Sequence, residues 1–590
     1  MNLTLSSALF NLQTKLADKN IDLFIINRSD EFLNEYISPY AERLKFITNF
    51  SGSAGKVIVL QNEAHLYVDG RYTFQAKDQI NNDEIKLKHI KTYWDDLKKF
   101  INKQTLKIAI DPKLHSVKEI QKIEKYILNT SSTIKFLDSN IIDTIWINKP
   151  KIKFTNIFDH PIKFSGKNRI DKLNDCINFL KNKNIDHYLV TGLDNIAWLL
   201  NIRADDILHT PLVFSYLLIS KSHKPSLYIK KEKLNYKLKL ELEKIINIYS
   251  IDNIENIFFE IKKNEIVGLD FSTTTYFFLK LLKKNNKNYK DLLNPLILNK
   301  AIKNPTEQSG AINANLRDGV SITRFIYWLK NQKDISSINE ISSSNYLKNL
   351  RVNNELFYSL SFDTISAFGK NAALPHYRVN ELSNASFKKD NIYLVDSGGQ
   401  YYDGTTDITR TIILGNANEE QKDRFTRVLK GHIAISSHIF AKGTKGTDID
   451  YLARESLQEI NCDYDHGTGH GIGSFLSVHE APQRIAKKSM FESVELFPGM
   501  IISNEPGYYK LNEYGIRIEN LVLVKENDDH LLFFENLSWC PIDIDLIDKN
   551  LLNKKELEWI NKYHSNVYIK LNSFLNQKEK KWLKLVTEPL

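Results

Sequence analysis

An internal repeat in the first half of the chain restricts the possible folds more than any other feature of the sequence. Three pairs of blocks match and keep their order along the chain: LADKNIDLFIIN at 16–27 with LKNKNIDHYLVT at 180–191, LKFITNF at 44–50 with IAWLLNI at 196–202, and HLY at 65–67 with SLY at 226–228. The longest block reads as the end of an amphipathic helix, a turn and a short apolar strand. We therefore predict two successive α/β domains that share one fold.

The length of the chain, 590 residues, requires a further domain, because one hydrophobic core rarely serves more than about 300 residues. Proline-containing junctions at 149–152 and 303–305 disfavour helix, and we predict domains at 1–150, 151–303 and 304–590. The third domain is expected to be α+β. Its predicted helices are 307–330, 421–438, 450–460 (capped by Thr447 or Asp448) and two in the last ~60 residues, and its predicted strands are 392–395, 409–414, 500–503 and 516–524.

Charge and cysteine content narrow the classes of function. The net charge of +9 comes from lysines scattered over many segments rather than from a patch with arginine and aromatic residues, so we expect no nucleic-acid partner. Cys176, Cys462 and Cys540 lie too far apart for a CxxC metal motif or a disulfide framework. No apolar run approaches the ~18 residues that a membrane span needs. These features predict a cytoplasmic protein with no membrane partner.

Two aspartates in the third domain suggest a metal site. The segment 392–414 reads IYLVDSGGQYYDGTTDITRTIIL, in which two strands flank a Tyr-Asp-Gly turn. This arrangement puts Asp396 and Asp407 on neighbouring antiparallel strands, where opposite Cβ atoms lie about 5 Å apart. Two carboxylates that close repel each other unless cations lie between them. The alternative is a hairpin whose aspartates only cap turns.

Three histidines lie close together in the sequence. His466 and His470 stand at i and i+4, which is similar to a zinc-protease helix, but the two intervening glycines and the missing glutamate disfavour that interpretation. A glycine-rich strand or loop is expected instead, with one histidine as a metal ligand and the other facing a substrate pocket. His479 adds a third histidine nine residues later. The alternative is that each is a buried core histidine.

Two glutamates complete a candidate ligand set. Glu505 follows an apolar strand, and the alternation in GIRIEN at 515–520 puts Arg517 and Glu519 on one face of a strand. A carboxylate on a buried face needs a partner, for which a cation or Arg517 would serve. Together with two aspartates and one histidine, the glutamates form an oxygen-rich set suited to Mn²⁺, Co²⁺ or Zn²⁺ in a dinuclear site.

These residues lie in motifs that resemble the aminopeptidase P branch of the pita-bread metallopeptidases, specifically the long three-domain Xaa-Pro aminopeptidases. The matching motifs are NPTEQSGAINANLRDGVSITRFIYWL at 304–329, DSGGQYYDGTTDITRT at 396–411, HGTGHGIGSFLSVHE at 466–480, SNEPGYY at 503–509 and GIRIEN at 515–520. The resemblance spans nearly the whole chain. It implies an α/β and α+β multidomain protein with two repeated creatinase-N-like α/β domains, followed by a C-terminal pita-bread α+β catalytic domain.

The resemblance also implies a role for each metal ligand. Asp396 would chelate one metal ion, Asp407 and Glu519 would bridge both ions, and His470 and Glu505 would complete the shell of the other. Glu505 would also accept a proton from the water between the ions. The cofactor implied is a pair of divalent metal ions per subunit, with Mn²⁺ first and Co²⁺ or Zn²⁺ as alternatives.

The residues around the ligands would bind the substrate. By resemblance, His376 lies near the scissile carbonyl, and His466 and His479 wall the pocket for proline, with His479 able to donate to the oxyanion. Arg517 and Tyr509 match residues that orient the carboxylates. The implied reaction releases the first residue from peptides with proline at the second position, by a hydroxide bound to both metal ions. The implied oligomer is a homodimer.

The same fold also serves methionine aminopeptidase, prolidase, creatinase and non-catalytic binding modules. A creatinase-like enzyme or a binding module should lose metal ligands, and this chain keeps the full set. Methionine aminopeptidase usually lacks the two N-terminal domains. Prolidase, an Xaa-Pro dipeptidase, is the main alternative, and it normally has one such domain. The alternative from another class is a chaperone or scaffold that binds peptides without cleaving them.

Overall fold

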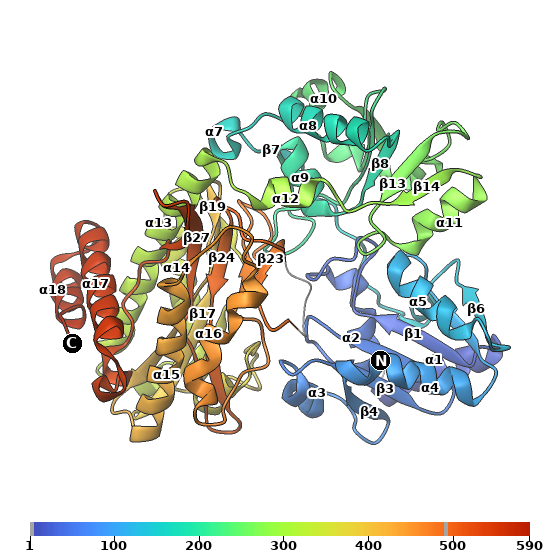
Figure 1. Cartoon of the computed structure of the whole chain (residues 1–590). Helices are drawn as coiled ribbons and strands as arrows, with labels where there is room; N and C mark the ends of the chain where they lie inside the picture. Colours follow the sequence, from blue (N-terminus) through green and yellow to red (C-terminus); the bar gives the residue numbers. More distant parts are fainter. Residues whose placement is uncertain (1–4, 489–493) are drawn as a thin grey trace. The chain divides into compact units, whose positions relative to one another are not determined.

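The computed structural model describes residues 5–488 and 494–590 (Figure 1). The chain separates into two compact units, one made of Met1–Asp159 with Asn168–Leu296, the other of His160–Lys167 with Ile297–Leu590. No helix in the described part of the chain is long and apolar enough to cross a membrane. Each unit is built around its own sheets.

The first unit contains two six-stranded sheets with the same topology. The first sheet has the order β4-β3-β2-β1-β5-β6, with β1 at Leu23–Asn27, β2 at Lys56–Leu60, β3 at Ala64–Val68, β4 at Ile85–His89, β5 at Lys107–Ile110 and β6 at Thr133–Phe136. The second has the order β12-β11-β10-β8-β13-β14, with β8 at His187–Val190, β10 at Tyr216–Ser220, β11 at Ser226–Ile229, β12 at Asn247–Ser250, β13 at Ile266–Leu269 and β14 at Asn288–Asp291. Equivalent neighbours also run in the same relative direction. The predicted repeat is confirmed, whereas the boundaries at 150 and 303 stay a prediction.

The two repeats meet through equivalent helices. Helix α5 (Val117–Ile127) and helix α11 (Tyr276–Lys284) start side by side in the two domains. The Val117 amide donates to the Thr274 carbonyl at 2.9 Å, and the Tyr276 amide donates to the His115 carbonyl at 2.9 Å. Because these hydrogen bonds are reciprocal, the repeats are related by an approximate two-fold arrangement at this contact.

The strands of the first sheet are buried on both faces. Phe24 and Ile26 of β1 pack into one core with helix α1 (Leu5–Asp18), and Leu23 and Ile25 pack into another with α5. A strand covered on both sides needs apolar residues at every position, which explains the continuous run LFII in β1.

The second unit is α+β, as predicted. Its strands form sheets with the orders β16-β17-β20, β15-β18-β19, β25-β26 and β21-β28-β27-β24-β22-β23. The strands are β15 (Phe357–Leu360), β16 (Ile365–Phe368), β17 (Asn391–Ser397), β18 (Gly399–Tyr401), β19 (Gly404–Thr405), β20 (Ile408–Leu414), β21 (Ile439–Phe440), β22 (Gly469–Gly471), β23 (Glu480–Ile485), β24 (Ile501–Asn504), β25 (Gly507–Lys510), β26 (Tyr514–Arg517), β27 (Asn520–Glu526) and β28 (Leu532–Asn536). Helices lie along the strands, and the last two stand together at the C-terminus (Figure 1).

Most predicted helices and strands of the second unit are confirmed. The helices are α13 (Pro305–Lys330), α14 (Glu340–Val352), α15 (Glu419–Ser436), α16 (Gly446–Gln458), α17 (Lys554–Leu571) and α18 (Gln577–Val586). Helix α13 begins with a capping box, because Asn304 accepts from the Glu307 amide while Glu307 accepts from the Asn304 amide. The predicted cap of the helix at 450–460 is wrong. That helix starts at Gly446, and Asp448 accepts from the Lys445 amide from inside the first turn.

The strand predicted at 516–524 is also wrong in part. The chain leaves one strand at Arg517, the end of β26, and enters another at Asn520, the start of β27. The two strands belong to different sheets. Alternation of apolar and polar residues cannot reveal such a change of sheet, because the period continues through Ile518 and Glu519.

Candidate metal centre

The two predicted aspartates come from paired strands. Asp396 lies in β17 opposite Thr409 of β20, and Asp407 immediately precedes β20. Strands β17 and β20 pair antiparallel, as predicted, but Asp407 lies just outside β20 and the two aspartates are not directly opposite each other. The chain between them forms the short hairpin of β18 and β19, which belongs to another sheet.

The other predicted ligands come from the six-stranded sheet. His470 lies in β22, which confirms a strand rather than a helix, and Glu505 follows β24 directly. Glu519 stands just before β27, and its amide donates to the Thr409 carbonyl at 3.2 Å, so that β20 and this sheet meet at the site. Ligand atoms of Asp407, His470 and Glu519 all lie within 4.8 Å of one another. The Nε2 atom of His470 is 3.5 Å from Asp407 Oδ2 and 3.5 Å from Glu505 Oε1.

Each buried carboxylate at the site keeps one oxygen without a hydrogen-bond donor. Among the residues that the structure describes, Asp396 Oδ1, Asp407 Oδ1 and Glu519 Oε1 have no such partner. The second oxygens of two of them are held, because Arg517 Nη2 donates to Asp396 Oδ2 at 2.7 Å and Thr409 donates to Glu519 Oε2 at 2.8 Å. A buried oxygen without a donor is costly unless a cation binds it. The residue set therefore fits divalent cations.

Electrostatics at the cluster also favour cation binding. Burial, reinforced by the neighbouring carboxylates, raises the pKa of Asp407 and of Glu519 well above the usual range. Burial and the nearby Asp396 raise the pKa of Glu505 to about 7, against the opposing effect of Arg517. A cation in the cluster would lower these three pKa values, since it favours the ionised carboxylates.

These pKa shifts predict how the cation-free protein responds to pH. Because the folded state raises the pKa of Glu505, its contribution to stability is present below the unfolded value and is lost as the pH rises toward about 7. Cation-free Glu505→Gln should therefore unfold at a higher temperature than cation-free wild type at pH 8, and this advantage should shrink at pH 5.5. We expect a difference of about 1–3 kcal/mol at pH 8, since each pKa unit is worth about 1.4 kcal/mol. Thermal unfolding of both EDTA-dialysed proteins measures it, and an advantage that grows toward low pH would contradict it.

Arg517 and Tyr509 connect the cluster to the histidines. Arg517 donates through Nη1 to the Tyr509 hydroxyl at 2.6 Å and through Nε to Thr409 Oγ1 at 3.2 Å, in addition to its contact with Asp396. The Tyr509 hydroxyl lies 2.8 Å from His466 Nε2. The Arg517 guanidinium is thus fully engaged within the protein, which suits a residue that orients carboxylates. The predicted roles of these residues toward substrate stay predictions.

The predicted substrate histidines occupy different environments. His466 is buried against Tyr464 and Tyr509, with ring centroids 4.7 and 5.4 Å away. His479 is half-buried, and its ring meets that of His470 edge to face with centroids 4.3 Å apart. His376 is half-buried in the loop between β16 and β17. His479 therefore lies directly beside a predicted ligand without being part of the cluster of ligand atoms.

Two hydroxyl residues at the site were missed from the sequence. Thr409 binds both Glu519 and Arg517, and Ser503 donates to Glu505 Oε1 at 3.2 Å while accepting from the His470 amide at 3.0 Å. Both stand two residues from a predicted ligand, Asp407 or Glu505. Since side chains two apart in a strand share a face, this spacing was a usable signal.

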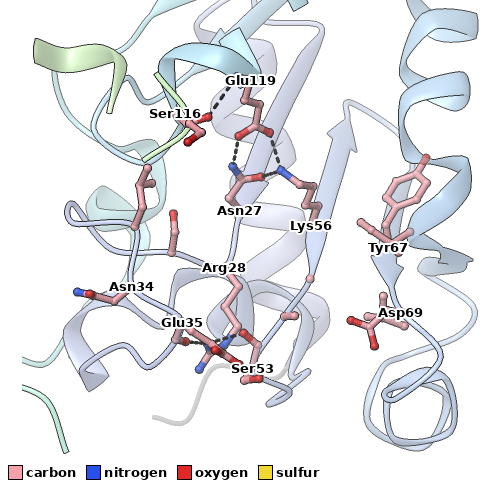
Figure 2. A pocket seen from close by; sticks show the side chains of 17 residues that line it. Asn27, Arg28, Asn34, Glu35, Ser53, Lys56, Tyr67, Asp69, Ser116 and Glu119 are labelled. Atoms are coloured by element: carbon pink, nitrogen blue, oxygen red, sulfur yellow. Dashed lines mark hydrogen bonds and ion pairs between the residues drawn. The ribbon is translucent and has the colours of Figure 1, made fainter. Parts of the chain in front are cut away.

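A separate cavity of about 440 Å³ lies in the first unit, and none of the predicted site residues lines it (Figure 2). Three of its lining residues form a polar cluster. In this cluster the Lys56 ammonium lies 2.5 Å from Glu119 Oε1 and 2.9 Å from Asn27 Oδ1. In the second repeat the positions of Lys56 and Glu119 are taken by Tyr216 and Phe278, whose rings pack edge to face at 4.9 Å. One repeat thus uses an ion pair where the other uses an aromatic pair.

Comparison with known proteins agrees with these observations. Residues 312–526 match the model of metallopeptidase family M24, and 530–590 match the C-terminal region of peptidase M24. Residues 9–144 and 148–307 each match a creatinase/prolidase N-terminal domain. The chain is therefore a pair of repeated creatinase-N-like domains followed by a pita-bread domain.

Similar proteins cover the whole chain. Proteins named probable Xaa-Pro aminopeptidase P from Paracoccidioides brasiliensis (strain Pb03) and Laccaria bicolor are both 35% identical, over 99% of this chain and 99% and 93% of theirs. The crystal structure of X-prolyl aminopeptidase from Caenorhabditis elegans, described as a cytosolic enzyme with a di-nuclear active site, has a TM-score of 0.94 and 31% identity over 100% of both chains. The prolidase of Pyrococcus horikoshii OT3 shares the fold over 63% of this chain, with a TM-score of 0.51 and 24% identity.

Proposed function

The chain belongs to the Xaa-Pro aminopeptidase P group of metallopeptidase family M24, and from that membership we propose that it removes the N-terminal residue from peptides with proline in second position. The observation that carries the proposal is the 35% identity over 99% of both chains to a protein of that name. The cluster of Asp407, His470 and Glu519 supports it, because a scaffold would have no need of the ligands.

We propose that two divalent cations bind between Asp396, Asp407, His470, Glu505 and Glu519. The buried oxygens without donors in three of these carboxylates support this assignment. When bound, such cations polarise the peptide carbonyl and lower the pKa of a water to near neutrality. We propose Mn²⁺ as the native ion, since four carboxylates and one imidazole form an oxygen-rich set, with Co²⁺ or Zn²⁺ as alternatives.

The side chains of the chain itself take the remaining roles in this proposal. Glu505, oriented by Ser503, accepts a proton from the attacking water. His479 and His376 donate hydrogen bonds to the oxygen that becomes negative in the transition state. Arg517 holds Asp396 in place, and His466 with Tyr509 forms a wall for the proline ring.

The requirement for proline follows from the chemistry of the bond. An Xaa-Pro bond is a tertiary amide without an N–H, and the proline ring fixes φ, so peptidases that align substrates through that N–H bind it poorly. Donors aimed at the carbonyl oxygen and a pocket shaped for a ring avoid this need.

Mass spectrometry of products with Mn²⁺ added tests this function. We expect Arg-Pro-Pro to yield arginine and Pro-Pro, at least about 10²-fold faster than Arg-Ala-Pro yields arginine, because the second peptide cannot fill the proline pocket. Faster cleavage of Gly-Pro than of Arg-Pro-Pro would instead indicate a prolidase. Absence of all cleavage in protein with its metal content verified would indicate a peptide-binding scaffold.

We also infer a cytosolic location and a homodimer. The description of the C. elegans relative as a cytosolic enzyme supports the location. The described chain has three free cysteines, Cys176, Cys462 and Cys540, which is consistent with a reducing compartment. The dimer rests on the family resemblance, and light scattering coupled to size-exclusion chromatography would measure it.

A further inference from the structure

A buried glutamate that is not one of the predicted ligands lies at the start of helix α14. Glu340 has no exposed surface, and four donors contact its carboxylate. Oε1 accepts from the Phe368 amide at 2.7 Å and from Asn371 Nδ2 at 2.9 Å. Oε2 accepts from the Tyr377 hydroxyl at 2.9 Å and from the Ala385 amide at 2.9 Å. All four donors are neutral groups.

The four donors belong to one continuous segment of chain. They span 368–385, which starts at the end of β16 and runs toward β17. A single carboxylate therefore binds both ends of this segment and two side chains between them. Removal of the carboxylate would leave the amides of Phe368 and Ala385 buried without acceptors, at a cost of about 1–3 kcal/mol each.

The same segment carries His376, next to Tyr377 in the sequence. The other side of this segment meets the hairpin of β25 and β26, which carries Tyr509 and Arg517. The contact is close, since a Cβ atom on Gly515 would lie 1.8 Å from the Ala372 carbonyl oxygen. The segment is thus fixed between Glu340 on one side and the hairpin of the metal centre on the other.

We propose that Glu340 is a positioning residue for His376. The inference rests on the role of His376 in the proposed function, and it adds a residue that touches neither the cations nor the substrate. Loss of the carboxylate would let the segment shift, and a shift of about 1 Å is enough to weaken a hydrogen bond in the transition state. Burial raises the pKa of the Glu340 carboxyl above its usual range, while the four hydrogen bonds oppose this shift. The positive end of helix α14 also favours the ionised form.

Glu340→Gln tests the proposal because it keeps the volume of the side chain but replaces one acceptor oxygen of the carboxylate with an amide group that donates. We expect kcat for Arg-Pro-Pro to fall about 10–10²-fold, with KM within about 3-fold and the metal content unchanged. In the His376→Ala background the same change should lower kcat less than about 3-fold, because the group that Glu340 positions is already gone. An equal loss in both backgrounds would overturn the proposal.

Asp543→Asn is a matched control. Asp543 is also a carboxylate with little exposure, and it accepts from the Ile413 amide at 2.9 Å and from Lys330 at the far end of β20. This control should lower stability but leave kcat within about 2-fold. Tyr377→Phe, which removes one donor to Glu340 at small cost in packing, should lower kcat in the same direction as Glu340→Gln by about 3–10-fold.

Hydrogen exchange separates this proposal from the proposed function. Amides in 368–385 should exchange at least about 10-fold faster in Glu340→Gln and not in Asp543→Asn. Unchanged exchange would overturn the proposal whatever the activity. If wild type fails to cleave Arg-Pro-Pro, the proposed function fails, and exchange still decides whether Glu340 holds the segment of His376.

Discussion

EDTA treatment should reduce Xaa-Pro cleavage to background, and Mn²⁺ or Co²⁺ should restore it. The reason lies in the cluster itself, where Asp396, Asp407 and Glu519 each keep a buried oxygen without a donor, and ligand atoms of Asp407 and Glu519 lie within 4.8 Å of each other. Such an arrangement is unfavourable unless cations bind it. The assay is the rate of arginine release from Arg-Pro-Pro in EDTA-dialysed protein, with elemental analysis before and after each addition.

Stability gives an independent measurement of the same site. Mn²⁺ at 1,000 times its Kd should stabilise the protein by about 4 kcal/mol, since ligand bound only to the folded state adds free energy by mass action. Asp407→Asn should lose most of this stabilisation. Ca²⁺ is the control ion, and we expect it to restore little activity because it prefers six to eight oxygen ligands. Full turnover in a preparation shown to contain no metal would contradict the assignment.

The sequence was sufficient for the parts of the site that depend on residue type and spacing. The repeated blocks at 16–27 and 180–191 predicted two domains of one fold, and both sheets have the same strand order. The motifs around Asp407, His470 and Glu519 predicted a cluster, and their ligand atoms meet. Metal ligands can be predicted from the sequence because each metal ion binds only certain types of side chain.

Features that depend on long-range packing were not predictable in the same way. The change of sheet between Arg517 and Asn520 leaves no trace in the alternation of residues. The role of Glu340 depends on contacts with a segment that ends 45 positions later in the chain, at Ala385. An isolated glutamate at the first turn of a helix is ordinary, and only the fold shows which donors surround it.

The repeats show how one fold can change its interior without changing its topology. Lys56 and Glu119 form an ion pair in the first repeat, and Tyr216 with Phe278 forms a ring contact at the equivalent positions. Both pairs join a central strand to the helix that meets the other repeat. The strand order is retained because it depends on backbone pairing and on burial of both sheet faces, whereas a single pair of side chains can vary.

The histidine substitutions should divide into two classes. His470 belongs to the cluster of ligand atoms, so His470→Ala should lose at least one metal ion together with activity, because a coordinating nitrogen has no easy substitute. His479 packs edge to face on the His470 ring and is not in the cluster of ligand atoms, and His376 lies in a separate loop. His479→Ala and His376→Ala should therefore keep two metal ions and melt close to wild type. Each should lower kcat by about 10²–10³-fold, the usual effect of losing one donor to the oxyanion.

Elemental analysis and single-turnover kinetics on the three variants measure this division. The alternative is that His376 and His479 are only packed structural histidines, in which case alanine should lower the melting temperature more than kcat. His432 is a suitable control for that alternative, because it is fully buried and donates from Nδ1 to the Asn504 carbonyl oxygen, 3.1 Å away. His432→Ala should reduce stability with little change in kcat. Metal loss in His479→Ala, or near-normal kcat in His376→Ala, would overturn the assignment.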